Sequence, residues 1–255
     1  MKKQTLVIFA MAALTLVVLA APVRADQVRL HGATTVVDRL INPNLGSVEK
    51  ATGHKLEIVG NATGKGLVDL VEGRCDASMS SEPLEIALSA AKTAGKEIDG
   101  GKLQFQVAMH DEIVFIVHPS NSVSSLTWEQ IRDIHTGKIK NWKDVGGKDA
   151  PITLFSDTIT GGTRAMIKKV VMGGADFSST AVVLTSVKKV GDMVAADPTG
   201  FGGLGKGFVD TSRTKIVQTK KVERPLGFIT VGAPTAKVAK VIDAFKAESK
   251  KAGNK

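Results

Sequence analysis

The alternation of apolar and polar positions in the first half of the chain predicts strands that alternate with helices. Short strands are predicted at 27–30 and 55–59, and each runs into a loop of small residues followed by apolar residues at helical spacing. A strand of small residues is predicted at 77–79, with a helix at 84–96 after it. This order is typical of a parallel sheet with helices on both faces and ligand-binding groups at the carboxyl ends of its strands.

The second half of the chain resumes this order after strands at 103–108 and 113–117. The run at 113–117 is continuously apolar, which predicts a strand buried on both faces and a crossover into a second lobe. A helix is predicted from residue 126 onward, with Thr127 as its N-cap and Gly137 as its end. We therefore expect an α/β fold with two lobes.

The end of the chain is predicted to return to the first lobe. An apolar strand at 226–231 precedes an amphipathic helix at 238–250. If the strand at 226–231 lies beside the one at 113–117, the chain crosses between the lobes twice. The predicted first lobe comprises 26–112 and 232–255, and the predicted second lobe comprises 113–231 with both hinge strands.

The N-terminus has the pattern of a cleavable signal peptide. Lys2 and Lys3 precede an apolar run at 6–21, and Val23-Arg24-Ala25 offers small residues before a cut after Ala25. The apolar run is short for a membrane span, so we predict a signal peptide of residues 1–25 and no stable membrane insertion after cleavage. The expected location is the periplasm.

The amino-acid composition limits the classes of ligand and partner that this protein can have. A net charge of +9 is compatible with nucleic acid, an anionic membrane surface or small anions. Export, the absence of tyrosine and the even spread of lysines argue against nucleic acid. Cys75 is the only cysteine, which excludes an internal disulfide and a metal site built on thiolates. We expect a monomer without a metal or a cofactor.

Three loops combine glycine with threonine at predicted helix starts. They are Gly32-Ala33-Thr34-Thr35, Gly60–Gly66 and Ser156–Arg164. Glycine lets the backbone approach a ligand, while free N–H groups of the first helical turn and threonine hydroxyls can donate to an anion. One such loop would indicate an ordinary capped helix, but three predict that the loops converge on one ligand.

An enzyme is the competing interpretation from another class. Ser80, Ser81, Ser156 and Cys75 are candidate nucleophiles, but no G-x-S-x-G or H-E-x-x-H motif joins any of them to a histidine. We therefore predict no catalytic residues, and a periplasmic hydrolase is the least favoured alternative. A binding protein of the same fold for a different anion, or a secreted sensor or interaction protein not tied to transport, stays open.

One segment resembles a known family. Leu126–Gly147 strongly resembles a segment of periplasmic phosphate-binding proteins of ABC transporters, and 224–234 is similar to their returning strand. The three loops match the anion-binding loops of that family in order. The resemblance implies a type II-like two-lobe binding protein with a mainly parallel sheet in each lobe and a double-crossover hinge. It also implies that the two lobes close over an oxyanion, with phosphate as the first candidate, and that the protein delivers this anion to ABC permease subunits.

The resemblance also implies the site residues. Carried over position by position, the ligand-binding set is Thr34, Thr35, Thr63, Gly64, Ser81, Gly161, Gly162, Thr163 and Arg164.

Three positions depart from the family pattern. Gly161 stands where the family commonly has a serine, Asp157 where it usually has an arginine, and Ser81 where some members have an aspartate. An ionised Asp157 would repel a dianion. Arg164, Arg74 and Lys65 are the candidates for a replacement cation. Because a serine hydroxyl can donate or accept, relaxed discrimination or a different oxyanion stays a hypothesis.

Overall fold

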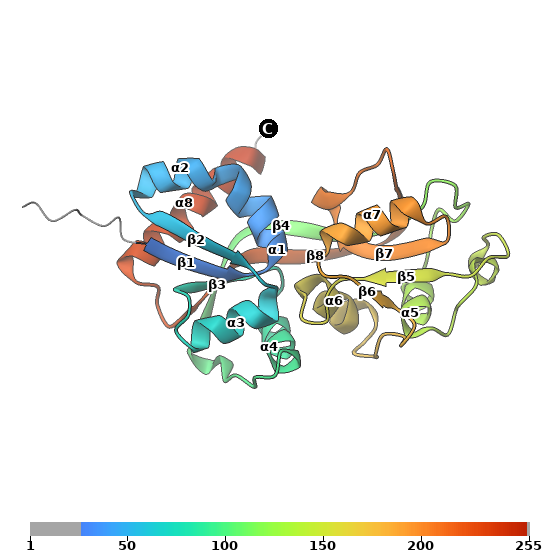
Figure 1. Cartoon of the computed structure of the whole chain (residues 1–255), viewed down its shortest axis with the longest axis horizontal. Helices are drawn as coiled ribbons and strands as arrows, with labels where there is room; N and C mark the ends of the chain where they lie inside the picture. Colours follow the sequence, from blue (N-terminus) through green and yellow to red (C-terminus); the bar gives the residue numbers. More distant parts are fainter. Residues whose placement is uncertain (1–26, 254–255) are drawn as a thin grey trace, which may run out of the picture.

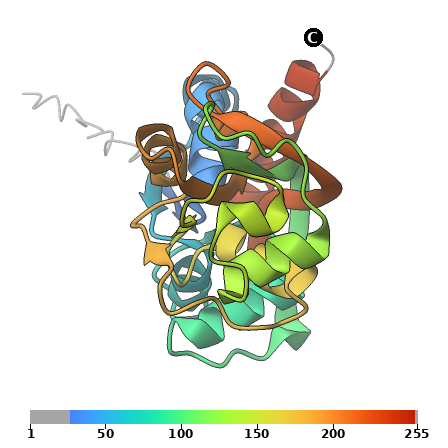
Figure 2. The ribbon, with the colours of Figure 1, turned by 90° about the vertical axis from the view of Figure 1, so that its right-hand side faces the viewer.

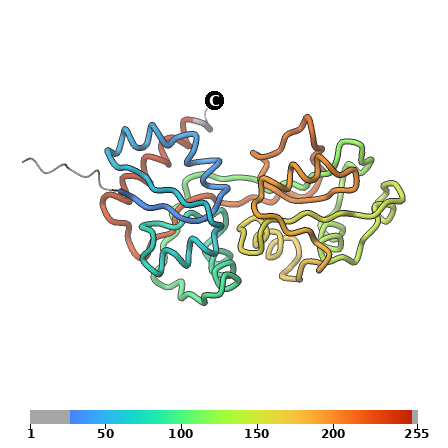
Figure 3. The backbone as a smooth tube through the Cα atoms, viewed as in Figure 1, coloured from blue at the N-terminus to red at the C-terminus, as the bar shows by residue number. Residues whose placement is uncertain are grey.

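The computed structural model describes residues 27–253 and shows two lobes joined by a pair of long strands (Figure 1). One eight-stranded sheet runs through both lobes in the order β2-β1-β3-β8-β4-β7-β5-β6. The strands β4 (Leu103–Val117) and β8 (Lys215–Val231) lie side by side and antiparallel, and Figure 3 shows the chain passing between the lobes along them. The predicted two-lobe α/β class is confirmed, whereas the predicted signal peptide lies outside the described residues.

The first lobe contains both ends of the described chain. Its strands and helices are β1 (Gln27–Gly32), α1 (Thr34–Val36), α2 (Asn42–Thr52), β2 (Lys55–Gly60), α3 (Thr63–Val71), β3 (Ala77–Ser80), α4 (Leu84–Thr93) and α8 (Ala236–Gly253). A π-helical segment, Val37–Ile41, joins α1 to α2. β1 pairs in parallel with β2 and β3, as predicted.

The second lobe repeats this layout. It contains α5 (Trp128–Thr136), β5 (Thr153–Ser156), α6 (Gly162–Met166), β6 (Val182–Val183), α7 (Lys188–Ala196) and β7 (Gly200–Gly205). A π-helical segment, Ile167–Val171, continues α6. β5 pairs in parallel with β6 and β7, so each lobe is parallel apart from the two shared strands. Figure 2 views the molecule from the end of this lobe, with α5 toward the viewer.

Each lobe has apolar packing on both faces of its part of the sheet. In the first lobe, Phe228 packs on Phe245 of α8 on one face, and Leu67 of α3 is buried on the other. In the second lobe, Phe115 and Phe201 stack above α5, while the opposite face is covered by α7. Full burial of such side chains stabilises each lobe by about 1.5–3 kcal/mol per residue.

Helix α5 shows why this segment could be located from the sequence. Thr127 Oγ1 accepts from the Gln130 backbone N–H, and the Gln130 side chain accepts from the Thr127 N–H, which forms a capping box. Gly137 ends the helix at a φ of 77°. Both predicted boundaries are confirmed.

The glycine-rich strand β7 was not predicted as a strand. Its glycines allow helices and neighbouring side chains to approach the sheet closely. A Cβ on Gly202 would lie 2.5 Å from Val190 of α7, and one on Gly203 would lie 2.6 Å from Ile167. Because glycine is usually disfavoured in strands, local propensity pointed away from the structure that tertiary packing selects.

The hinge differs from the predicted pairing. Residues 226–231 pair with 103–109 and with β3, so they belong to the sheet of the first lobe rather than facing 113–117. The central stretch pairs Asp111 with Arg224 and lies between two register shifts, at Val107/Met109 and Ile113/Phe115. The segments predicted as separate strands at 103–108 and 113–117 are therefore one strand, β4, with an irregular middle.

Candidate functional site

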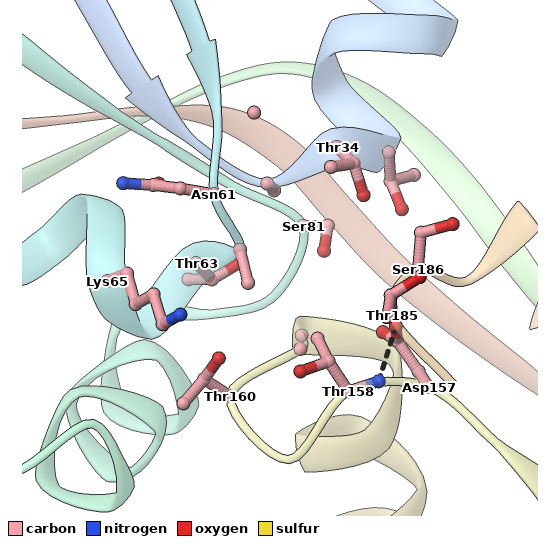
Figure 4. Close-up of a pocket in the computed structure, with 16 residues that line it drawn as sticks. Thr34, Asn61, Thr63, Lys65, Ser81, Asp157, Thr158, Thr160, Thr185 and Ser186 are labelled. Atoms are coloured by element: carbon pink, nitrogen blue, oxygen red, sulfur yellow. Dashed lines mark hydrogen bonds between the residues drawn. The ribbon is translucent and has the colours of Figure 1, made fainter. Parts of the chain in front are cut away.

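A cavity of about 170 Å³ lies between the lobes at the ends of the short strands. Figure 4 shows side chains from both lobes pointing toward this space. The first lobe contributes Ala33, Thr34, Thr35, Gly60, Asn61, Ala62, Thr63, Lys65 and Ser81. The second lobe contributes Asp157, Thr158, Thr160, Gly161, Gly162, Thr185 and Ser186.

Backbone hydrogen bonds fix the first-lobe loops around the cavity. The N–H of Ala33 donates to Met79 O at 2.9 Å, and the N–H groups of Asn61 and Ala62 both donate to Gly32 O at 3.0 Å. These bonds hold the carboxyl ends of β1, β2 and β3 together. The loops after parallel strands therefore meet at one edge of the sheet, as the sequence predicted.

Ala62 adopts a backbone conformation that costs energy. Among residues 27–253 it is the one non-glycine residue with positive φ, at φ 76° and ψ 151°. We expect Ala62→Gly to raise the free energy of unfolding by about 1 kcal/mol, because relief of about 1–3 kcal/mol of strain exceeds the entropic cost of glycine. Urea unfolding measures this difference.

The matched control for Ala62 is Ala247→Gly, on the exposed side of α8. There the same change should lower the free energy of unfolding by about 1 kcal/mol. Loss of stability in both variants would show that Ala62 carries no strain.

The structure brings six of the nine predicted ligand-binding residues to the cavity. They are Thr34, Thr35, Thr63, Ser81, Gly161 and Gly162. The other three, Gly64, Thr163 and Arg164, do not line it. The Gly64 N–H donates across the lobes to Thr160 O at 3.3 Å, and Thr163 Oγ1 accepts from Arg224 Nη1 at 2.7 Å.

The three residues predicted to replace the family's arginine do not all lie at the cavity. Arg164 does not line this cavity, because its Nη1 donates to Ser156 Oγ at 2.5 Å and its guanidinium lies 3.7 Å from the Phe177 ring centre. Arg74 does not line the cavity and pairs instead with Asp69 of α3. Of the three candidates, Lys65 alone lines the cavity.

Several residues of the cavity were absent from the predicted set. Thr185 and Ser186 follow β6, so the signal that located the other loops, a short polar stretch after a strand, was also present there. Asn61 and Thr158 lie within loops that the sequence did single out. What the sequence did not show is that these side chains face the same space.

Two threonine hydroxyls, one from each lobe, are buried at the cavity without a hydrogen bond of ordinary geometry. Within residues 27–253, they are Thr63 Oγ1 from the first lobe and Thr160 Oγ1 from the second, which are among the few buried side-chain oxygens without a hydrogen-bond partner. Thr63 is fully buried and Thr160 is 4% exposed. Since an unsatisfied buried hydroxyl costs about 1–3 kcal/mol, Thr160 is suited to hydrogen-bond a ligand in the cavity. The Thr63 hydroxyl also lies beside the Glu82 carboxyl and can turn to a ligand instead.

Two carboxyl groups approach the cavity from different lobes. Glu82 is fully buried, and burial raises the pKa of its carboxyl to about 7 despite the hydroxyls of Thr63 and Ser81 nearby. Asp157 is 6% exposed, and burial raises the pKa of its carboxyl to about 6. The repulsion expected from an ionised Asp157 is therefore reduced where this carboxyl holds a proton.

A buried ion pair between β4 and β8 is hydrogen-bonded to the helix that follows one of the cavity loops. Arg224 of β8 is fully buried, and its Nη2 and Nε donate to Asp111 Oδ2 of β4 at 2.8 and 3.2 Å. Through Thr163, the same guanidinium holds the first turn of α6. The sequence analysis assigns Arg224 only to the returning strand. Nothing in its sequence context predicts its contact with Thr163 of α6.

The candidate catalytic groups have other partners. Ser80 Oγ donates to Glu82 O at 2.8 Å, and Ser81 Oγ donates to Glu82 Oε2 at 2.8 Å. Burial raises the pKa of the Cys75 thiol to about 12, which disfavours a thiolate. Within residues 27–253, no three His, Cys, Asp or Glu side chains are placed to hold a metal ion, and no helix is long and apolar enough to cross a membrane.

Comparison with known proteins gives matches over most of the chain. The model of the PBP superfamily domain matches residues 20–255. The "Phosphate-binding protein PstS" of Borreliella burgdorferi is 28% identical over 138 residues, which cover 51% of this chain and 49% of that protein. The matched part therefore spans about half the length of this curated relative.

Solved structures match over a larger share of both chains. A substrate-binding protein from Clostridium perfringens, solved with bound phosphate, has a TM-score of 0.74 and 26% identity, covering 86% of this chain and 92% of that one. An ABC-type phosphate transport receptor from Vibrio cholerae has a TM-score of 0.70 and 24% identity, covering 89% and 96%.

Proposed function

This chain belongs to the PBP superfamily, and from that membership we propose that it captures an inorganic oxyanion, phosphate foremost, between its lobes and delivers it to an ABC permease. The observation that carries the proposal is a pair of buried hydroxyls without a hydrogen bond of ordinary geometry, Thr63 from one lobe and Thr160 from the other, that line one cavity between the lobes. The phosphate bound in the Clostridium perfringens structure supports the choice of ligand.

The proposed mechanism is hinge closure. An anion that accepts from hydroxyls and helix N-termini of both lobes stabilises the closed form, because the open form offers it only one wall. Direct contacts already join the lobes in this structure: Gly64 N–H donates to Thr160 O, and Lys188 pairs with Asp38 at 2.7 Å. The irregular middle of β4 and β8 is the place where we expect the chain to bend.

The remaining assignments follow from this proposal. We place the protein in the periplasm as a monomer, after removal of residues 1–25, and we propose no catalytic activity, nucleic-acid partner or cofactor. The engagement of Ser80 and Ser81 with Glu82 supports a binding role over a hydrolase. Lys65, with fixed N–H and hydroxyl donors, offsets the charge of the anion.

Calorimetric titration of the ligand-free protein tests the proposal. We expect phosphate to bind, and Thr63→Val to weaken its binding at least about tenfold, because the substitution keeps the shape of the side chain and removes one buried donor. Thr93→Val, on the exposed side of α4, is the matched control and should bind as the wild type does.

Sulfate, arsenate and molybdate serve as parallel ligands in this titration. Binding of one of these without phosphate would assign the cavity to another oxyanion. Absence of heat with all four, in a protein that unfolds cooperatively, would overturn the proposal.

A further inference from the structure

A second cavity, of about 520 Å³, lies between the lobes. Within residues 27–253 it shares no lining residue with the anion cavity. Helix α4 supplies its first-lobe wall, and α6, the π-helical segment Ile167–Val171 and residues 174–177 supply most of its second-lobe wall. Figure 1 shows α4 beside α6, where this cavity opens. Its volume lies in the range of about 300–1,000 Å³ that is usual for sites of small organic molecules.

The loop between β5 and α6 contributes to both cavities. Thr158 and Thr160 line the anion cavity, whereas Ile159 between them lines the second cavity and is 57% exposed. The same loop touches the first lobe, because Thr160 O accepts from the Gly64 N–H at 3.3 Å. A ligand that packs on Ile159 therefore contacts the loop that presents the Thr160 hydroxyl to the anion.

Apolar side chains from both lobes form part of the lining. Ile86 and Ala90 come from α4, while Ile159, Ala165 and Phe177 come from the second lobe. Ile86 is 4% exposed and packs in the core of the second lobe although its helix belongs to the first. These surfaces favour a ligand with an apolar body, because its burial removes apolar area from water on both sides.

Arg164 adds a positive charge whose hydrogen-bonding capacity is only partly used. Its Nη1 donates to Ser156 Oγ, and its guanidinium lies 3.7 Å from the Phe177 ring centre. In the part of the chain that the structure describes, no carboxylate lies within 4.0 Å of this guanidinium. Burial lowers the pKa of Arg164 although Asp157 and Asp176 attract its charge. A carboxylate on the ligand would compensate this charge and accept from the remaining N–H groups.

The other charged side chains of the cavity leave this attraction in place. Lys168 and Asp176 form a pair at 2.7 Å, so they largely compensate each other. The remaining charges of the lining are Arg164 and Lys169 against Glu85 of α4. The balance is positive, which favours an anion over a cation.

We propose that this second cavity binds a small organic anion with a planar apolar body and one carboxylate, and that the bound molecule favours the closed form of the protein. A planar body can stack beside the guanidinium and Phe177 and reach Ile159. An inorganic anion would leave the apolar wall without a partner, and a neutral ring would leave the Arg164 charge without one.

The effect on closure follows from the two walls. Because α4 belongs to one lobe and α6 to the other, separation of the lobes divides the site, and its ligand gains contacts only when they close. Two ligands that both favour the closed form raise each other's affinity by the same factor. This coupling rests on the proposed oxyanion-binding function, whereas the second site itself does not.

The probe is naphthoate, with its neutral amide, naphthamide, and acetate as comparison ligands. Calorimetric titration of the wild-type chain should give a dissociation constant for naphthoate of about 0.1–1 mM, with naphthamide and acetate each at least about tenfold weaker. Saturating naphthoate should raise the affinity for phosphate about fivefold or more, and phosphate should raise that for naphthoate equally. Small-angle scattering should show compaction by naphthoate alone.

Two substitutions from opposite walls test the position of the site. Arg164→Met keeps an apolar side chain without the charge, and we expect it to weaken naphthoate binding at least about tenfold. Ser89→Glu adds a negative charge to the exposed side of α4, and we expect it to weaken naphthoate at least about threefold while phosphate alone binds as in the wild type. Ser47→Glu, the same change on the exposed side of α2, is the matched control and should leave both ligands unaffected.

Three results would overturn the inference. They are the absence of naphthoate binding at about 2 mM, naphthamide bound as tightly as naphthoate, and unchanged naphthoate affinity in folded Arg164→Met and Ser89→Glu proteins. Naphthoate binding without compaction would overturn its effect on closure. A chain that binds and closes on naphthoate but takes up no oxyanion would instead remove the proposed function and leave the second site in place.

Discussion

Gly162→Ala is expected to weaken anion binding on the order of 100-fold, because the closed form can no longer be reached. A Cβ at this position would lie 1.7 Å from Glu82 Oε2 and 2.5 Å from Ser81 Oγ. Both acceptors are buried, so neither side chain has room to withdraw. Each lobe keeps its own core, and we therefore expect the open protein to remain folded while the population of the closed form falls.

Titration with phosphate and small-angle scattering with and without it measure this effect together. The wild type should become more compact when phosphate is added, and Gly162→Ala should not. Gly46→Ala is the matched control, since Gly46 lies in α2 with no atom within 4 Å of an added Cβ. It should bind normally and be about 1 kcal/mol more stable. Normal compaction and affinity in Gly162→Ala would show that the Glu82–Gly162 contact does not limit closure.

Arg224→Met is expected to lower the free energy of unfolding by about 3–5 kcal/mol, because it leaves the Asp111 carboxylate buried without its partner. Arg224 is fully buried and Asp111 is 8% exposed to solvent, so water cannot replace the lost donors. Thr163 also loses the donor that holds its hydroxyl. Urea unfolding at neutral pH measures the loss.

The double variant Arg224→Met with Asp111→Asn separates the penalty of an unpaired charge from the value of the pair. We expect it to recover more than half of the stability that Arg224→Met loses, since the uncompensated carboxylate is gone. Arg213→Met removes an exposed arginine paired with Asp192 and should change stability little. Equal losses in Arg213→Met and Arg224→Met would show that burial of the hinge ion pair has no special weight.

The sequence by itself determined the class of fold and three of the loops that form the cavity. Alternating strands and helices require a sheet with both faces covered, and glycine with threonine after a strand leaves N–H groups and hydroxyls free. These are local properties of consecutive residues. The capping box at Thr127 and the stop at Gly137 were predictable for the same reason.

Only the tertiary structure decided which polar groups share the cavity. Arg164 occupies a loop that the sequence singled out, yet Phe177 and Ser156 hold it outside. Arg224 and Glu82 lie far apart in the chain. The long strand β8 brings Arg224 to Thr163 at the start of α6, and Gly162 permits the close approach of Glu82. The strand β7 likewise forms because neighbouring helices fill the space that its glycines leave. Such contacts join residues distant in sequence, so no local sequence pattern predicts them.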